Sequence, residues 1–441
     1  MKFAVQFLSV FLMLSVTYFL GNLIPRTDFQ TTAGLYVILF GLMFLVFSLS
    51  GEKTPWFFIF IAGILLRFSL FLAIPQWSDD YARFLWDGEL IRIQENPYSE
   101  KPAEFLENHP QETTEMLNQL FPLLNSPEYF SVYPPLNQVV FWLSAKAANG
   151  TIVNGIICLR LLLILGEITV FMLFLKLFKT FQKPQKLLWL YWLNPLVILE
   201  ITGNLHFEGL VLLLLLGSVL AIGKKQASAG GGLWGLAVGI KLLPFMLIPA
   251  FLSYSKIRNN KLFWIGAFMA ILFSFGWLWI DSSLSNFSQS LSLYLGKFEF
   301  NASIYYLLRE VGFWIKGYNT IATLTKILSA TTLILILFFS WKKKPQTLQE
   351  LVDLMVLIYL TYLILQPVVH PWYLIPAFGL SLLTQRNAFL VWTFAVIFSY
   401  AAYGNEGFIE KPFFLLTEYA FVFAAIYTDY FLLKRKPNLS Q

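Results

Sequence analysis

Cysteine, histidine and charged residues are scarce in this sequence. Its 441 residues include one cysteine, three histidines and only 13% charged residues. The single Cys158 excludes an intrachain disulfide. A chain with so little charge and 57% hydrophobic residues is too apolar to be a soluble domain of this length. The formal net charge of +6 is explained by basic loops between apolar runs, so it does not indicate a nucleic-acid partner.

Long apolar runs recur along the chain. Many reach the roughly 18 residues needed to cross about 30 Å of hydrocarbon, and they lack the period-2 alternation of a membrane β-barrel. We therefore predict an all-α polytopic membrane protein with about twelve transmembrane helices, forming a single integral membrane domain over residues 1–441. The expected spans lie near residues 3–23, 32–50, 54–74, 154–177, 186–202, 207–223, 262–281, 318–341, 349–368, 371–384, 387–403 and 413–433. The first run is interpreted as a span because it lacks a clear small-residue cleavage site.

Basic residues between these runs predict the orientation of the chain. Cytoplasmic loops carry an excess of lysine and arginine, and one arrangement places the basic segments KLFKTFQKPQK, WKKKPQ and KRK inside. This arrangement puts both termini in the cytoplasm. It makes residues 75–150 the first large extracytoplasmic loop, with interfacial helices, and it leaves the short apolar run 134–148 as a helix at the outer face.

Charged residues inside the apolar runs indicate further features. The run 230–254 carries Lys241 and Pro244 at its middle, which favours a broken helical hairpin that enters and leaves on the inner side. Arg160 and Glu167 are seven residues apart on one helix face, so we interpret them as a structural pair or as neighbours of Lys241. Arg67 is expected to extend its side chain outward toward the membrane surface.

The densest cluster of charge, five acids and two arginines, falls in residues 77–98, directly after an apolar run. Ionisable groups at the edge of a bilayer are costly to place and commonly mark a function. A helix that begins here carries Asp80, Arg83 and Asp87 on one face. A carboxylate held beside an arginine stays ionised and can accept a proton from a hydroxyl. The alternative is that these residues only cap and anchor an interfacial helix.

A second polar cluster is expected at an outer turn between two spans. The segment NPLVILEITGNLHFEG, residues 194–209, carries Glu200, Asn204, His206 and Glu208 around this turn. Such side chains can orient sugar hydroxyls or a phosphate, whereas one histidine and two glutamates at this spacing are a weak metal signal. The alternative is ordinary loop polarity with a Gly–Asn turn.

Three further residues are candidates for substrate binding. His370 lies between two prolines in QPVVHPWYLIP, Tyr133 begins YPPLNQ, and Arg309 lies in FEFNASIYYLLRE. A histidine can bind a phosphate oxygen or transfer a proton, and an arginine can pair with a lipid phosphate as a planar fork. The alternatives are a structural role for His370 and plain packing for Tyr133 and Arg309.

These motifs, in this order, resemble a family of bacterial membrane enzymes. The pattern D-x-x-R-F-x-W-D-G begins at Asp80 and is followed by N-P-Y at residues 96–98. YPPLNQ, the 194–209 segment, the G-x-A-x-x-x-K-L-x-P hairpin, FNASIYY and HPWYL follow, so the resemblance covers roughly residues 55–380. The chain is similar to the polyprenyl-phosphate-mannose-dependent mannosyltransferases of the GT-C superfamily.

The resemblance implies a GT-C-type fold and a hexosyltransferase. It implies transfer of a sugar, typically mannose, from a polyprenyl-phosphate donor to an extracytoplasmic lipid or glycan acceptor, with inversion. The family's essential first-loop aspartate corresponds to Asp80, which would act as general base, and the adjacent Asp79 is its rival. The family's tyrosine is one position early here, at Tyr81. No cofactor or divalent metal is expected, because a phosphate leaving group carries its own charge.

The predicted substrate-binding residues complete the hypothesis, with Arg309, His370 and His206 as candidates to stabilise the leaving phosphate. They are Arg83, Asp87, Tyr133, Asn204, His206, Glu208, Arg309 and His370. The alternative function is a transporter or flippase of lipid-linked sugars, which predicts internal pseudo-symmetry and paired broken helices. One broken hairpin and no evident repeat favour the enzyme.

Overall fold

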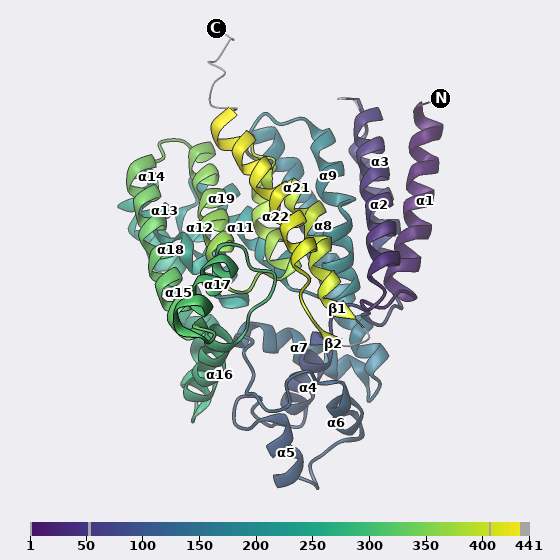
Figure 1. Ribbon diagram of the computed structural model, residues 1–441, viewed down its shortest axis with the longest axis vertical. Helices are drawn as coiled ribbons and strands as arrows, with labels where there is room; N and C mark the ends of the chain where they lie inside the picture. Colours follow the sequence, from purple (N-terminus) through teal and green to yellow (C-terminus); the bar gives the residue numbers. More distant parts are fainter. Residues whose placement is uncertain (1, 52–53, 405–406, 433–441) are drawn as a thin grey trace.

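Helices dominate the computed structural model, which describes residues 2–51, 54–404 and 407–432 (Figure 1). Within these ranges the strands are confined to one short antiparallel pair, β1 (Tyr403–Gly404) and β2 (Gly407–Phe408). The predicted basic segment KRK, residues 434–436, lies outside the described residues.

Seven helical segments in the described part of the chain are long and apolar enough to cross a membrane. They are α1 (Lys2–Asn22), α2 (Phe29–Leu49), α8 (Ile152–Thr180), Lys261–Trp279 with α15 (Lys261–Phe275), α18 (Ile321–Lys343), α19 (Leu348–Leu365), and Pro412–Leu432 with α22 (Pro412–Tyr427). A further bent pair, Pro195–Gly203 and Glu208–Gly223, turns by 113° at its break. The prediction of an all-α polytopic membrane protein is therefore confirmed.

The expected count of about twelve spans differs from these seven because several apolar runs form short or broken helices. The runs are occupied by α3 (Trp56–Phe68), α9 (Leu188–Trp192), α10 (Pro195–Val197), α11 (Glu208–Gly223), α20 (Ile375–Ser381) and α21 (Ala388–Ala395). Pro195 and Pro371 each begin a new helical segment, because proline removes a backbone donor and interrupts a helix. In Figure 1, α3, α9 and α21 stand in one layer with the long helices.

A lobe of shorter helices lies at the lower end of this layer in Figure 1. It contains α4 (Asp80–Arg92), α5 (Pro102–Asn108), α6 (Glu115–Leu120) and α7 (Pro135–Ala148), all within the segment 75–150. Helices α4 and α7 pack almost backbone to backbone at Gly88, where an added Cβ would lie 2.2 Å from the carbonyl oxygen of Phe141. Only glycine permits this approach, which holds α4 and α7 together within the lobe.

The predicted broken hairpin is present. Helix α12 (Ala227–Ile240) ends before Lys241, and a short helical turn, Leu243–Leu247, leads into α13 (Ile248–Ser253) and α14 (Ser255–Arg258). Helix α12 runs parallel to α15, because Gly231 lies against Phe263 and Gly239 lies against Ser274. Since α15 follows directly after α14, the chain returns to the end at which α12 began.

Two predictions about buried charge are wrong. Arg67 does not extend outward: it is fully buried and donates to Glu167 Oε2 at 2.8 Å. Arg160 does not pair with Glu167 but donates to the carbonyl oxygens of Thr202, Phe71 and Ala73. Seven residues along a helix separate two side chains by about 10 Å, so partners from neighbouring helices lie closer than one on the same helix.

Two remaining helices, α16 (Ser283–Lys297) and α17 (Ile304–Lys316), lie between α15 and α18 in the chain, and α16 extends down beside the lobe in Figure 1. The chain between α16 and α17 is joined to the segment before α20 by a bridge between Phe300 and Val368. This bridge brings the residues around His370 toward the lower end of the layer, where the cavity lies.

Candidate active site

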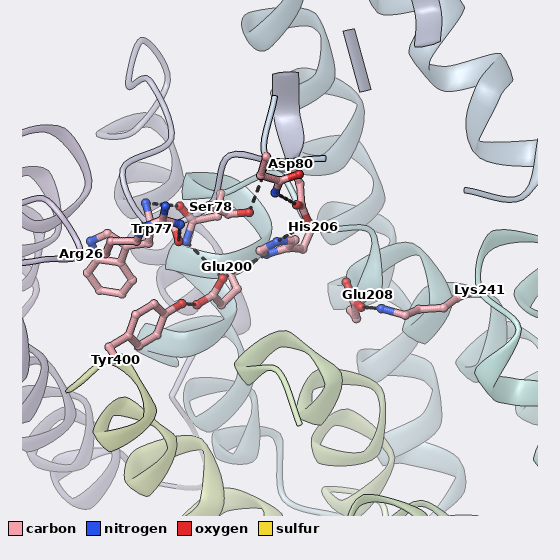
Figure 2. A network of polar contacts seen from close by, with 11 residues as sticks. Arg26, Trp77, Ser78, Asp80, Glu200, His206, Glu208, Lys241 and Tyr400 are labelled. Atoms are coloured by element: carbon pink, nitrogen blue, oxygen red, sulfur yellow. Dashed lines mark hydrogen bonds and ion pairs between the residues drawn. The ribbon is translucent and has the colours of Figure 1, made fainter. Parts of the chain in front are cut away.

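A cavity of about 590 Å³ lies between the helical layer and the lobe. Six of the predicted site residues line it, namely Asp79, Asp80, Tyr133, His206, Glu208 and His370. They come from the start of α4, the loop before α7, the break before α11, and the segment before α20. Residues from four distant parts of the sequence therefore converge on one cavity, and Figure 2 shows the polar network on its wall.

Asp80 is the first residue of α4 and faces this cavity. Its Oδ2 lies 3.6 Å from His206 Nε2, its Oδ1 accepts from Asn125 Nδ2 at 3.3 Å, and its side chain is 25% exposed. Burial alone would raise the pKa of the Asp80 carboxyl, but the contact with His206 and the hydrogen bond from Asn125 bring that pKa below its ordinary value. The start of a helix also favours a negative charge. Asp80 is therefore held as a carboxylate.

The neighbour that stabilises this carboxylate was wrongly predicted. The expected arginine, Arg83, donates its Nε to Asp87 Oδ1 at 2.7 Å and not to Asp80. An arginine reaches a carboxylate four residues on along a helix, and the buried Asp87 occupies that position. His206 takes the place that the sequence assigned to the arginine.

His206 is held between two carboxylates (Figure 2). Its Nδ1 lies 3.0 Å from Glu200 Oε2, while Nε2 faces Asp80. Only an imidazolium presents N–H groups to both carboxylates. The ring also stacks on Trp372 with the ring centres 3.6 Å apart. The chain reaches this position because Leu205 adopts a left-handed φ of 66° after the helical segment ends.

Glu200 is the buried centre of this network. It accepts hydrogen bonds from Tyr400 Oη and, at 3.1 Å, from Asn204 Nδ2. Asn204 does not line the cavity, and its Oδ1 instead accepts from the backbone N–H of Trp77 at 3.2 Å. Glu200 and Asn204 thus connect the broken segment before α11 to the chain that enters α4. Tyr400 was missed from the sequence, because it lies 200 positions from Glu200 and no local pattern connects them.

The adjacent Asp79 has a different partner. Arg26, between α1 and α2, donates to Asp79 Oδ2 at 2.6 Å and to the carbonyl oxygen of Trp77 at 3.3 Å. Both side chains of this pair are partly exposed. The two adjacent aspartates therefore lie on the same cavity, one paired with an arginine and the other beside a histidine.

Arg83 and Asp87 lie beneath the cavity wall and are not among its lining residues. Arg83 donates to the carbonyl oxygen of Tyr129 at 2.9 Å, and Asp87 Oδ2 accepts from Gln138 Nε2 at 2.9 Å and from the Ser131 hydroxyl. These bonds tie the loop 125–133 to α4. Through this loop they position Asn125 and Tyr133, which do line the cavity.

A second charged pair lies in the same cavity, apart from Asp80. Glu208, the first residue of α11, pairs with Lys241 at the break of the hairpin, and the Lys241 ammonium lies 4.0 Å from the ring centre of Tyr373. Burial lowers the pKa of His370 to about 3, so this ring is neutral. It stacks on Trp372 with the ring centres 4.5 Å apart.

Arg309 is not brought to this cavity. It lies on α17, where it pairs with Glu299 at 2.7 Å and Glu310 at 3.0 Å and covers the ring of Tyr306. In the described part of the chain, no group of three or more His, Cys, Asp or Glu side chains is arranged to hold a metal ion. Among the polar groups that line the cavity are the carboxylates of Asp79, Asp80 and Glu208, the Arg26 guanidinium, the Lys241 ammonium group, and the imidazoles of His206 and His370.

Comparison with known proteins identifies the family of this chain. Residues 21–255, more than half of the chain, match the family described as alpha-(1->6)-mannopyranosyltransferase, N-terminal domain. A relative from Corynebacterium glutamicum, alpha-(1->6)-mannopyranosyltransferase A, is 25% identical over 186 residues. That match covers 41% of this chain and 35% of the relative, so the chain spans about a third of the relative's length. Asp80, His206 and Lys241 lie within the matched range.

Proposed function

The chain belongs to the alpha-(1->6)-mannopyranosyltransferase family, and we propose that it transfers a mannosyl unit from a polyprenyl-phosphate donor to an extracytoplasmic lipid or glycan acceptor. The observation that carries this proposal is Asp80, a carboxylate on a cavity wall held by His206 and Asn125. A cavity of about 590 Å³ accommodates a sugar and a phosphate, and its polar groups are few and convergent, as in small-molecule sites.

In the proposed reaction Asp80 is the general base. It accepts the proton of the acceptor hydroxyl as that oxygen forms a bond to the anomeric carbon of the donor. The bond from this carbon to the phosphate oxygen breaks, and its electron pair leaves with the phosphate. A single displacement of this kind inverts the anomeric centre, and the proton then passes from Asp80 to water.

His206 acts on this reaction through Asp80. Its Nδ1 is held by Glu200, and its Nε2 faces the carboxylate that takes the proton. This arrangement orients Asp80 and keeps it ionised until the hydroxyl arrives. Asp79 is the weaker candidate for the base, because Arg26 forms a 2.6 Å ion pair with its carboxylate.

The leaving phosphate needs hydrogen-bond donors, and His370 is one candidate. Its ring lines the cavity, and its Nδ1 is buried without a hydrogen-bond partner in the described part of the chain. A neutral imidazole donates one hydrogen bond, so His370 can hold a phosphate oxygen without adding charge. The mechanism uses no metal ion, because the phosphate departs with its own charge.

The basic residues support an extracytoplasmic cavity with both termini in the cytoplasm. Lys179 lies in the last turn of α8, whereas the first turn of α8 follows the lobe. Lys342 and Lys343 lie in the last turn of α18. Helix α1 begins at the upper end of Figure 1, away from the lobe. Because basic residues favour the cytoplasmic side, the cavity faces outward.

The test is mannosyl transfer by the purified full-length protein, given mannosyl-phosphoryl-polyprenol and a cell lipid extract as acceptor. Asp80→Asn is expected to lower kcat by about 10²- to 10⁴-fold, the usual contribution of a general base. Asp79→Asn is the matched control, because it changes an adjacent acid on the same cavity and is expected to cost less than about tenfold. Transfer is expected to be insensitive to a chelator.

Three results would contradict the proposal in different ways. Unchanged transfer by Asp80→Asn removes the assigned base. Loss of transfer in the Asp79→Asn variant alone makes Asp79 the base. A wild-type protein that binds the donor and moves it across a vesicle membrane without sugar transfer is a transporter of lipid-linked sugars.

A further inference from the structure

We propose that Lys241 anchors the phosphate of the lipid donor and that Glu208 competes with this phosphate for the same ammonium group. The broken hairpin is then the lipid-phosphate site of the protein, and Glu208 controls release of the phosphate product. This inference rests on the proposed function, because it names the part of the cavity that holds the leaving group.

The position of Lys241 follows from the break in the hairpin. Helix α12 ends at Ile240, and Lys241 adopts an extended backbone with φ −150° and ψ 133°. The carbonyl oxygen of Ile240, which the break leaves without a helical partner, accepts from Asn137 Nδ2 at 2.9 Å. Asn137 lies on α7, so α7 stabilises the break. The break directs the side chain of Lys241 into the cavity.

The ammonium group of Lys241 has capacity for a second anion. An ammonium carries three N–H donors, and among the described residues Lys241 donates to Glu208 alone. The side chain of Lys241 is 31% exposed, whereas that of Glu208 is 3% exposed. Lysine binds phosphate as a compact point charge. Because the exposed partner of the pair is the cation, an anion entering the cavity meets Lys241 before it meets Glu208.

Glu208 does not depend on Lys241 alone for its charge. It is the first residue of α11, and the positive end of a helix dipole stabilises an acid at this position. The carboxylate can therefore share or release the ammonium group when a phosphate binds, and it can take that group back when the phosphate leaves.

The charge of the phosphate changes during the proposed reaction. The donor is a phosphodiester with one negative charge, whereas the product is a phosphomonoester with about 1.5 to 2 negative charges near neutral pH. A lone lysine would therefore hold the product more tightly than the donor. A carboxylate already beside that lysine weakens binding of the product and shortens its residence.

The same hairpin carries an apolar wall suited to a prenyl chain. Ile240, Leu242, Leu243, Phe245 and Met246 line the cavity next to Lys241. Phe245 is 53% exposed, so this apolar wall is accessible to a lipid chain. Figure 2 shows the Glu208–Lys241 pair apart from the Asp80–His206 pair, as expected if the sugar lies between its base and its phosphate.

The test is equilibrium binding of polyprenyl phosphate to the purified full-length protein, followed by tryptophan fluorescence. Polyprenol and inorganic phosphate are the comparison ligands, and they separate the contributions of the tail and the phosphate. Lys241→Gln is expected to weaken binding of polyprenyl phosphate at least tenfold and to leave binding of polyprenol unchanged. Lys241→Arg is expected to restore binding. Lys146→Gln, which removes an exposed lysine of α7 outside the cavity, is the matched control.

Glu208→Gln distinguishes competition from a structural pair. Removal of the competing charge is expected to tighten polyprenyl phosphate binding several-fold and to lower both kcat and the KM for the donor. A Glu208→Gln variant that binds the lipid phosphate more weakly than wild type would overturn the competition. A wild-type protein that binds polyprenol and polyprenyl phosphate equally well would overturn the phosphate site without use of any variant.

Failure of this inference and failure of the proposed function have different signatures. If the protein binds polyprenyl phosphate through Lys241 but transfers no sugar, the lipid-phosphate site stands and the transferase function is wrong. If the protein transfers mannose but the Lys241→Gln variant binds polyprenyl phosphate as wild type does, the transferase function stands and the lipid-phosphate site is wrong.

Discussion

The helical layer contains two similar clusters of buried polar side chains. In each cluster a glutamate accepts a hydrogen bond from a tyrosine hydroxyl and pairs with a cation, and this cation stacks on a tryptophan ring. In the first, the Arg67 cluster, Glu167 accepts from Tyr191 Oη at 2.9 Å and from Arg67 at 2.8 Å. The guanidinium carbon lies 3.7 Å from the centre of the Trp192 ring. The other hydrogen bonds that Arg67 makes to described residues go to backbone carbonyl oxygens.

The second, the His206 cluster, has the same parts around Glu200. This glutamate accepts from Tyr400 Oη and lies 3.0 Å from His206 Nδ1, and the imidazole stacks on Trp372. The two clusters differ in what the cation contacts on the side away from its glutamate. His206 Nε2 faces Asp80 and the cavity, whereas Arg67 is enclosed by protein.

This difference indicates which buried charges in a membrane protein are structural and which can take part in chemistry. Burial and pairing are common to both clusters, so neither property separates structure from chemistry. The His206 cluster has a partner, Asp80, that meets a cavity, and the Arg67 cluster has none among its hydrogen bonds. We therefore assign stability to the first cluster and catalysis to the second, and the following predictions test this assignment.

The largest expected effect is on stability, at the Arg67 cluster. Glu167→Gln leaves the Arg67 charge buried without a compensating carboxylate, which costs about 3–5 kcal/mol of unfolding free energy. The change is measured as a lowered unfolding midpoint in detergent. Transfer per folded molecule is expected to stay normal, so a stable variant that has lost transfer would contradict the assignment.

The matching change at the His206 cluster is expected to act on catalysis. Glu200→Gln removes the charge that holds His206 Nδ1, so Asp80 loses its oriented neighbour. Transfer is expected to fall about 10- to 100-fold, the range found when the partner of a metal-bound histidine is removed. Initial rates at saturating donor measure the effect. An unfolding midpoint that falls as far as that of Glu167→Gln, with unchanged kcat, would make the two clusters equivalent.

The tyrosines provide a smaller comparison of the same kind. Tyr191→Phe and Tyr400→Phe each remove one hydrogen bond to a buried glutamate, which costs about 1 kcal/mol of unfolding free energy. Only Tyr400→Phe is expected to slow transfer, by up to roughly tenfold if that energy appears in the barrier. Equal slowing by both variants would show that the effect is general loosening of the layer.

The smallest expected effect is the response to mild acid. The pKa of Asp80 lies below its ordinary value and that of His370 is about 3, so neither group titrates between pH 5 and 7. The contribution of the Asp80 charge to stability is present above the ordinary pKa of about 3.9 and is lost as pH falls through the lower folded value. For these two groups, kcat/KM is expected to stay constant from pH 7 to 5. A fall in kcat/KM below about pH 6.5 that persists in the His206→Gln variant would contradict this expectation and assign the fall to His370.

Local sequence patterns predicted where a helix begins but not the contacts of its charged residues. A helix was expected to begin near Asp80, and α4 begins there. The face that carries Asp80, Arg83 and Asp87 was also expected, yet Arg83 pairs with Asp87 and holds a loop. Periodicity assigns residues to a face of one helix, but it does not say which neighbour along that face is the nearer partner.

The long-range partners had no signal in the sequence. Tyr400 lies 200 positions from Glu200, and Arg26 lies 53 positions from Asp79. Arg309 was expected near the phosphate because an arginine suits that ligand, but it lies on α17 with Glu299 and Glu310. Residue type alone does not determine which of several segments contributes to a cavity.

Composition and periodicity by themselves determined that this chain is a helical membrane protein, that its hairpin breaks at Lys241, and that acids gather in the segment 77–98, which contains α4. These are properties of short stretches of chain, which hydrophobicity and backbone chemistry decide locally. The tertiary structure decided that His206 and not Arg83 stabilises Asp80, that Arg67 is enclosed, and that Lys241 meets Glu208. Such pairings depend on how helices from distant parts of the chain pack together, because only packing determines which buried charges lie within reach of one another.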